Sequence, residues 1–144
     1  QLPATDMARA IIPWRKKQHL LALGADQSPP LGEFAYWLYF LNRPTAFLKG
    51  PEKFARLQQV PIVMMTTTKP KRGHYHFEYF LLADHPKELK EGELMRQYAK
   101  HLEENIKLQP EIYLWSHKRW KRQWKPEYAD LWVDDKPVPD LSMN

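Results

Sequence analysis

The sequence contains no cysteine and little glycine, and these shortages remove several classes of site. Without cysteine among its 144 residues, the chain can form no disulfide, no thiolate zinc site and no cysteine nucleophile. Its five glycines form neither a Gly-x-Gly-x-x-Gly fingerprint nor a phosphate-binding loop. No apolar run approaches the roughly 18–20 residues of a membrane-spanning helix, and the N-terminus has no signal-peptide pattern.

What the chain does contain is apolar and unevenly charged. Apolar residues make up 43% of the sequence and aromatic residues 13%, which indicates a folded domain with a core. The formal net charge is +5, but residues 115–125 carry five basic and no acidic side chains, whereas residues 126–144 carry five acidic and one basic. We therefore expect one domain at 1–125 and an acidic tail at 126–144 that folds back to screen the basic segment.

Hydrophobic periodicity predicts an α/β fold with a mixed, mostly parallel sheet flanked by helices. The expected helices are 5–18 (capped by Thr5 or Asp6 and kinked at Pro13), 50–59 and 91–110; the expected strands are 19–26, 60–68 and 74–83, with 34–42 as strand or loop. Residues 19–26 and 60–68 are continuous apolar runs, which are typical of buried strands, whereas 74–83 alternates like a half-buried antiparallel strand. In the helix at 91–110, Glu103 and Lys107 are spaced for an ion pair.

Asp26 is a candidate site residue because of its place in this pattern. It is the last residue of the range 19–26, directly after the apolar run, and it precedes a Pro-Pro turn. Ligands of α/β sheets bind beyond the C-terminal ends of buried strands. The alternative is that Asp26 only hydrogen-bonds its own turn. His74, His76 and Glu78 would share one strand face and could bind a metal, but a solvated face is favoured because no fourth ligand suggests itself.

Residues 113–124, YLWSHKRWKRQW, place three tryptophans among four basic side chains. On a helix, Trp120 and Trp124 would share a face while Arg119 and Arg122 would lie on another side. Such a segment could grip nucleic acid, rest on a membrane surface, or pack its tryptophans on a core while its charges face an anion. A nucleic-acid-binding module is the alternative to the interpretation below; the acidic tail and the helical spacing argue against it.

Four segments carry a resemblance to a known family: ADQSPP (25–30), YFLNRPTAFLKGPEKFAR (39–56), VPIVMM (60–65) and PEIYLWSHKRWK (110–121). In this order and spacing they resemble the C-terminal half of the lipid A biosynthesis acyltransferases, the lauroyl/myristoyl transferase group of the lysophospholipid acyltransferase superfamily. The ending Pro-Glu-x-Tyr-x-Trp-x-His-x-Arg-Trp-Lys is the most specific piece. The first two segments are similar to the Bacteroidetes-type branch. The resemblance extends to about Trp124.

The resemblance implies transfer of a fatty acyl chain, usually from acyl carrier protein, to a hydroxyl of a lipid A precursor at the cytoplasmic face of the inner membrane. It implies no metal or organic cofactor and no nucleic-acid partner. The family's base is a His followed five residues later by Asp or Glu. None of the six histidines here has an acid at that spacing. We therefore expect this chain to be an incomplete half of an acyltransferase-like domain, inactive alone and partnered by an N-terminal half that carries the motif.

The resemblance also assigns roles to individual residues. Asp26 would support catalysis, and the substrate would contact Arg9, Gln27, Thr45, Gly50, Glu52, His117, Arg119 and Lys121; none of these is a metal ligand. Thr45, Gly50 and Glu52 stand where related acyltransferases have a loop for the phosphorylated acceptor, although the loop sequence differs here. Arg119 and Lys121 would face lipid headgroups, lipid A phosphates or the acidic carrier protein. A solvated basic face over packed tryptophans is the alternative.

Overall fold

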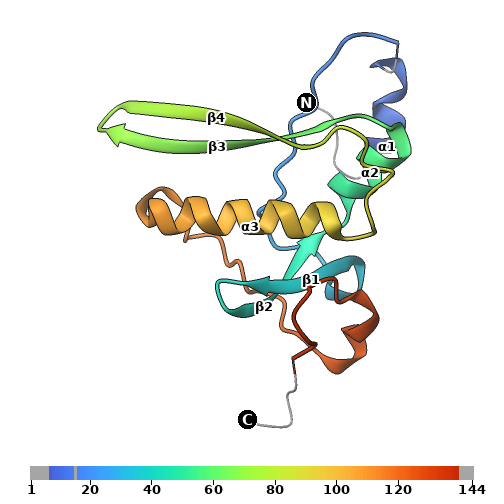
Figure 1. The fold of residues 1–144 in the computed structure, drawn as a ribbon, viewed down its shortest axis with the longest axis vertical. Coiled ribbons are helices and arrows are strands. Elements are labelled where there is room, and N and C mark those ends of the chain that lie inside the picture. The colour runs from blue at the N-terminus through green and yellow to red at the C-terminus, as the bar shows by residue number, and fades with distance from the viewer. Residues whose placement is uncertain (1–6, 15, 140–144) are drawn as a thin grey trace.

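The computed structural model describes residues 7–14 and 16–139, and its main elements are two β-hairpins and one long helix (Figure 1). Strand β1 (Ala35–Phe40) pairs with β2 (Arg43–Leu48), and β3 (Ile62–Lys71) pairs with β4 (His74–Ala83). The α-helices are α1 (Met7–Ala10), α2 (Gly50–Gln58) and α3 (Glu93–Leu108). Short 3-10 helices occur at Ile12–Trp14, Gly32–Phe34, Pro110–Ile112 and Pro126–Leu131.

The mixed α/β class is confirmed, but the mostly parallel sheet is wrong. Both sheets are antiparallel hairpins, and a single parallel bridge joins Trp37 to Trp132. The strand expected at 19–26 is also wrong, since this stretch has no regular secondary structure and Leu20 is 91% exposed. An apolar strand needs neighbours along its edges, and the described part of the chain offers this stretch none.

The N-terminal helix is shorter than expected. Within the range 5–18, α1 ends at Ala10 and a 3-10 turn follows at Ile12–Trp14, because proline at position 13 lacks the N–H that a continuous helix requires. The candidate caps Thr5 and Asp6 lie outside the described residues. No helix in the described part of the chain is long and apolar enough to cross a membrane.

The hairpin β1–β2 has a two-residue turn with both residues in the left-handed region, Leu41 at φ 50° and Asn42 at φ 61°. This geometry matches the right-handed twist of paired strands, and asparagine tolerates it well. Leucine tolerates it less well, and its backbone is held from outside: Leu41 N–H donates to Glu103 Oε2 on α3 (2.9 Å). Glu103 also accepts from Lys107 Nζ (2.6 Å), which confirms the expected ion pair.

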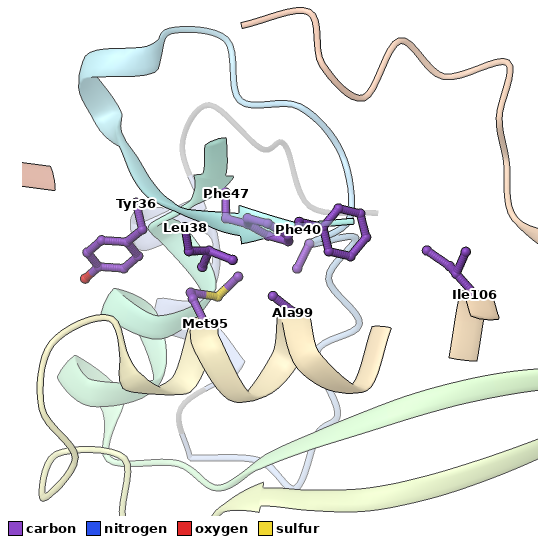
Figure 2. Packing of buried hydrophobic residues seen from close by; sticks show 8 residues of the cluster. Tyr36, Leu38, Phe40, Phe47, Met95, Ala99 and Ile106 are labelled. Atoms are coloured by element: carbon purple, nitrogen blue, oxygen red, sulfur yellow. The ribbon is translucent and has the colours of Figure 1, made fainter. Parts of the chain in front are cut away.

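One face of β1–β2 packs on α3 and forms the main core (Figure 2). Cross-strand partners share a face, so Tyr36 and Phe47 point the same way. Figure 2 shows them with Leu38 and Phe40 directed towards Met95 and Ala99 of α3. The sequence has an apolar repeat along this helix at Leu94, Tyr98, Leu102 and Ile106; Ile106 belongs to the core cluster, whereas Met95 and Ala99 lie outside that repeat.

The opposite face of β1–β2 is covered by the end of the chain. Trp37 stacks on Tyr128 (ring centroids 5.3 Å apart) and meets the edge of Trp124. Val133 N–H then donates to Trp37 O (2.9 Å) along the outer edge of β1. Residues 126–133 of the acidic tail therefore belong to the packed structure, and β1 is buried on both faces.

Hairpin β3–β4 lies beside α3 and touches it with one face only. Met64 and Thr66 are buried on that face, and Phe80 stacks on His101 of α3 (5.7 Å). The amide of Gln109 donates to Lys69 O and accepts from Lys69 N–H, which fixes the outer edge of β3 to the helix. Residues 60–68 thus form an edge strand rather than the expected central one.

Candidate functional site

The basic-aromatic segment 113–124 is not a helix. It is a chain of turns that runs along β2 and then crosses to the other face of the hairpin. Trp120 Nε1–H donates to Thr45 Oγ1 (2.9 Å), and Trp124 is buried against Trp37. The spacing of four between Trp120 and Trp124 is therefore set by the two faces of one hairpin. Of the three tryptophans in this segment, only Trp115 is largely exposed.

Arg119 lies inside this packing rather than on a basic surface. Its side chain is 2% exposed. Nη1–H donates to Ala46 O on the outer edge of β2 (2.8 Å), and the guanidinium lies 4.2 Å from the ring centroid of Phe47. The Nε and Nη2 groups of Arg119 are buried without a hydrogen-bond acceptor. Arg119, expected as a surface cation, is thus a buried cation in which two nitrogen groups have no hydrogen-bond acceptor.

Arg119 has an acid and two phenols as electrostatic neighbours. Burial lowers the pKa of Arg119, and the nearby Tyr113, Asp26 and Tyr98 oppose that effect. Burial likewise raises the pKa of Tyr98 and of Tyr113, with a contribution from Asp26 in each case. The Tyr113 hydroxyl is also buried without a partner. We call Asp26, Tyr98, Tyr113 and Arg119 the polar cluster.

The turn that carries Asp26 is fastened to the basic-aromatic segment by two hydrogen bonds. Ser28 N–H donates to Nε2 of His117 (2.9 Å), and Arg122 Nε–H donates to Pro29 O (3.3 Å). Nε2 of His117 therefore acts as an acceptor here, so this nitrogen carries no proton. His117 fixes the position of the turn, and through it the position of the Asp26 carboxylate.

A cavity of about 260 Å³ opens beside the polar cluster. Asp26, Tyr98 and Tyr113 line it, together with apolar side chains from three parts of the chain: Leu23, Met64, Met65, Leu102, Ile106 and Ile112. Arg119 does not line the cavity and acts on it through the other members of the cluster. Thr66, Thr67, Asn105 and Gln109 line it as well, so the cavity is open and offers apolar and polar groups in similar measure.

Thr45, Gly50 and Glu52, expected to form one acceptor loop, contact different partners. Thr45 is fully buried, and its hydroxyl donates to Arg43 O as well as accepting from Trp120. Gly50 is exposed at the start of α2. Glu52 is 0% exposed and accepts from the N–H groups of Gly92 (2.7 Å) and Met95 (3.3 Å). Both oxygens of Glu52 therefore cap the N-terminus of α3.

The pKa of Glu52 reflects this position. Burial raises it, while the hydrogen bonds from Gly92 and Met95 and the charge of Arg56 act in the opposite direction without cancelling it. A glutamate from another helix can take this role because the residue at the N-cap of α3 is Gly92, which has no side chain of its own.

The remaining expected residues are exposed. Arg9 lies on α1, Gln27 in the turn after Asp26, and Lys121 in the basic-aromatic segment. None of the three lines the cavity beside the polar cluster. Among the described residues, no group of three or more His, Asp or Glu side chains comes close enough to hold a metal ion; on β4, His76 and Glu78 contact each other (3.5 Å).

The structure adds Tyr98, Tyr113 and Ser28 to the residues that the sequence indicated. The sequence pattern assigned Tyr98 to a core stripe, and it does pack beside the core, but its hydroxyl end reaches the cavity. The signal for Tyr113 was present, since it belongs to the ending Pro-Glu-x-Tyr-x-Trp-x-His-x-Arg-Trp-Lys. Nothing local to Ser28 predicts that its backbone binds a histidine 89 residues away.

Comparison with known proteins gives one match. The model of a family described as "Bacterial lipid A biosynthesis acyltransferase" matches residues 6–122. The match begins before α1 and ends inside the basic-aromatic segment, so it includes every member of the polar cluster. No curated protein and no solved structure matches the chain significantly.

Proposed function

Because the chain belongs to the bacterial lipid A biosynthesis acyltransferase family, we propose that it forms part of an enzyme that acylates a lipid A precursor or a related lipid hydroxyl. The acyl donor in this proposal is acyl carrier protein, and the site of action is the cytoplasmic face of the inner membrane. The general base comes from an N-terminal half, since no histidine of this chain has an acid five residues later. The chain alone is then inactive.

The observation that carries this proposal is the polar cluster beside the cavity. A fatty acyl chain requires apolar surroundings, and Leu102, Ile106 and Met64 line the cavity with apolar side chains. The reacting carbonyl and hydroxyl require polar groups at its wall, and Asp26 and Tyr113 are there. Asp26 is also the residue that the family resemblance links to catalysis.

In this proposal Arg119 and His117 are positioning residues. The buried cation of Arg119 attracts the nearby Asp26 carboxylate, and His117 holds the backbone of the turn that carries it. Thr45 supports the same arrangement through Trp120. Arg9, Gln27 and Lys121 contact the phosphorylated acceptor or the carrier protein in this proposal, and the positive charges of Arg9 and Lys121 attract such acidic partners over a longer range.

The test uses Asp26→Asn in the enzyme that includes the N-terminal half, with Asp84→Asn as a matched control at an exposed position. We expect Asp26→Asn to lower kcat at least about tenfold, as loss of a group acting in the transition state does. Tm should fall only slightly, because no described hydrogen bond uses the carboxylate and only its attraction to the buried cation of Arg119 is lost. Asp84→Asn should leave both unchanged. If Asp26→Asn lowers Tm but keeps normal turnover per folded molecule, Asp26 is a structural residue.

A further inference from the structure

Hairpin β3–β4 has one face packed on α3 and one face without any cover (Figure 1). The uncovered face is formed by side chains that alternate with the buried ones along both strands: Val63, Met65, Phe77, Tyr79 and Leu81, each at least half exposed. It is apolar from the body of the molecule nearly to the hairpin tip. Contiguous apolar surface of this kind marks a place where something else binds.

The backbone of β4 is open along the same residues. Thr67 O accepts from Asn105 on α3, so the backbone groups of Thr67 point away from β4. In an antiparallel pair the residues directly opposite each other share this orientation, and it alternates along the strand. The backbone groups of Phe77, Tyr79 and Leu81 therefore point outwards, and no hydrogen bond in the described part of the chain satisfies them.

The total surface area of the chain indicates how much surface a partner would cover. The chain exposes 10,362 Å², whereas a compact monomer of 17.2 kDa exposes roughly 7,800 Å². The difference, roughly 2,600 Å², belongs to one chain and is comparable to the roughly 1,000–2,500 Å² that each partner of a permanent interface buries. The apolar stretch around Leu20 adds to this exposed surface, although its sequence has the pattern of a buried strand.

The open edge decides what kind of partner fits. A lipid bilayer would cover the apolar face, but it cannot hydrogen-bond the outward N–H and C=O groups of β4, and open sheet edges do not occur in hydrocarbon. A second copy paired at β4 would satisfy the edge and leave the apolar faces of both hairpins in water. Only a larger protein surface with a strand and a covering layer meets both requirements.

We propose that this surface is the docking site for the N-terminal half that supplies the catalytic histidine: a strand of that half pairs with β4, and an apolar layer covers Phe77, Tyr79 and Leu81. This inference rests on the proposed function, which requires such a half. The occupant carries acidic side chains near the hairpin tip, where Lys69, Lys71 and Arg72 are clustered. A two-stranded sheet is marginally stable by itself, so pairing also stabilises the hairpin.

Hydrogen exchange of this chain, alone and mixed with the separately produced N-terminal half, tests the docking directly. At low chain concentration, we expect the amides of Phe77, Tyr79 and Leu81 to exchange freely and to slow by about tenfold or more once the N-terminal half is added. Tyr79→Lys places a charge on the apolar face and should remove this protection. His76→Lys is the matched control, exposed on the same strand but on the opposite face, and should keep it.

Three results would overturn the docking proposal. Protection that rises with the concentration of this chain alone identifies a second copy as the occupant. Protection by anionic vesicles without any protein identifies a bilayer. Binding of the N-terminal half that leaves all three β4 amides unprotected places the contact elsewhere.

Acyl transfer by the mixture separates this inference from the proposed function. If the β4 amides are protected but no acyl transfer from acyl carrier protein follows, the docking surface stands and the proposed function fails. If transfer is restored while the amides stay unprotected, the function stands and the docking surface is wrong. Failure of the docking proposal and failure of the proposed acyl transfer therefore give different results.

Discussion

Removing the Glu52 carboxylate tests whether this residue is a cap of α3 or a group that awaits substrate. Glu52 is on α2, and its two oxygens accept from Gly92 N–H and Met95 N–H at the start of α3. α3 in turn carries Met95 and Ala99 of the main core and lines the cavity beside the polar cluster. In Glu52→Ala, two buried N–H groups lose their acceptor and the helix loses its cap.

The size of the effect follows from these two contacts. A hydrogen bond to a charged group contributes about 1.5–3 kcal/mol, and the bond from Met95 is the longer of the two. The cost of burying the carboxylate, visible in its raised pKa, offsets part of this. We expect Glu52→Ala to lower the free energy of unfolding by about 2–3 kcal/mol, which corresponds to a fall in Tm of about 8 °C for a domain of this size.

The effect should also depend on pH in a defined direction. Because burial raises the pKa of Glu52 above its ordinary value of 4.5, the folded state binds its proton more tightly than the unfolded state does. The stability that Glu52 contributes is thus fully present below pH 4.5 and declines as the pH rises through the folded-state pKa. The difference in unfolding free energy between wild type and Glu52→Ala should therefore be larger at pH 5 than at pH 8.

Urea denaturation of this chain at the two pH values measures both quantities. Glu88→Ala is the control, since Glu88 is exposed and its side chain makes no described hydrogen bond. It should change the free energy of unfolding by less than about 0.5 kcal/mol. A Glu52→Ala variant as stable as wild type at both pH values would show that the capping argument is wrong and would leave substrate binding as the role of Glu52.

Three further changes have distinct expected outcomes. Gly92→Ala should cost about 3 kcal/mol or more, because Gly92 has φ +81° and an added Cβ would collide with both Cγ1 and Cβ of Val133; Val133→Gly in the same chain removes both atoms and should restore part of the loss in thermal denaturation. Arg119→Ala should lower the free energy of unfolding by about 3 kcal/mol, equally at 50 and 500 mM salt, because a buried cation is little screened; Lys121→Ala, on the surface of the same segment, is the control. This chain alone should transfer no acyl group from acyl carrier protein, and turnover abolished by mutating one of its own histidines would contradict that.

The sequence predicted correctly those helices and strands whose local residue pattern is enough to specify their secondary structure, whatever they pack against. Helix α3 has a four-residue apolar repeat strong enough to specify a helix before any packing, and α2 begins at the Gly-Pro pair where the sequence indicated. Strand β4 forms where expected and pairs antiparallel with β3, but the expected half-burial is wrong: residues 74–81 are all exposed, and the apolar face of the strand is the uncovered one. Its partner β3 was also expected, but not its place at an edge, because a continuous apolar run indicates burial without saying which neighbours provide it.

The errors concern segments whose conformation depends on distant groups. The stretch at 19–26 has the composition of a buried strand, yet it has no strand beside it, forms no regular secondary structure and buries only Ala25. Residues 113–124 have helix-like spacing, yet Trp120 and Trp124 pack on opposite faces of β1–β2. In both cases tertiary contacts, which no local pattern records, overrule propensity.

The candidate site was predicted in its residue types more than in its geometry. Asp26, His117 and Arg119 do converge, since His117 holds the turn of Asp26 and Arg119 interacts electrostatically with it. Arg119 is buried and His117 binds a backbone N–H, and the expected contacts of these two side chains with substrate stay predictions. Charge and aromatic content indicated that the basic-aromatic segment is a candidate site. Which of its charged side chains is buried depends on its packing against the β1–β2 hairpin, which the local sequence does not record.

The uncovered face of the β3–β4 hairpin and the cavity beside Asp26 share a residue of β3. Met65 is on the uncovered face of the β3–β4 hairpin and also lines the cavity beside Asp26. A partner layer over that face would therefore form a wall of the cavity as well as cover the hairpin. Under the docking proposal, the same contact that buries Phe77 and Tyr79 would also bring groups of the other half next to the Asp26 carboxylate. The proposed function assigns the proton of the acceptor hydroxyl to a histidine of that half, and the uncovered face is where this histidine can enter.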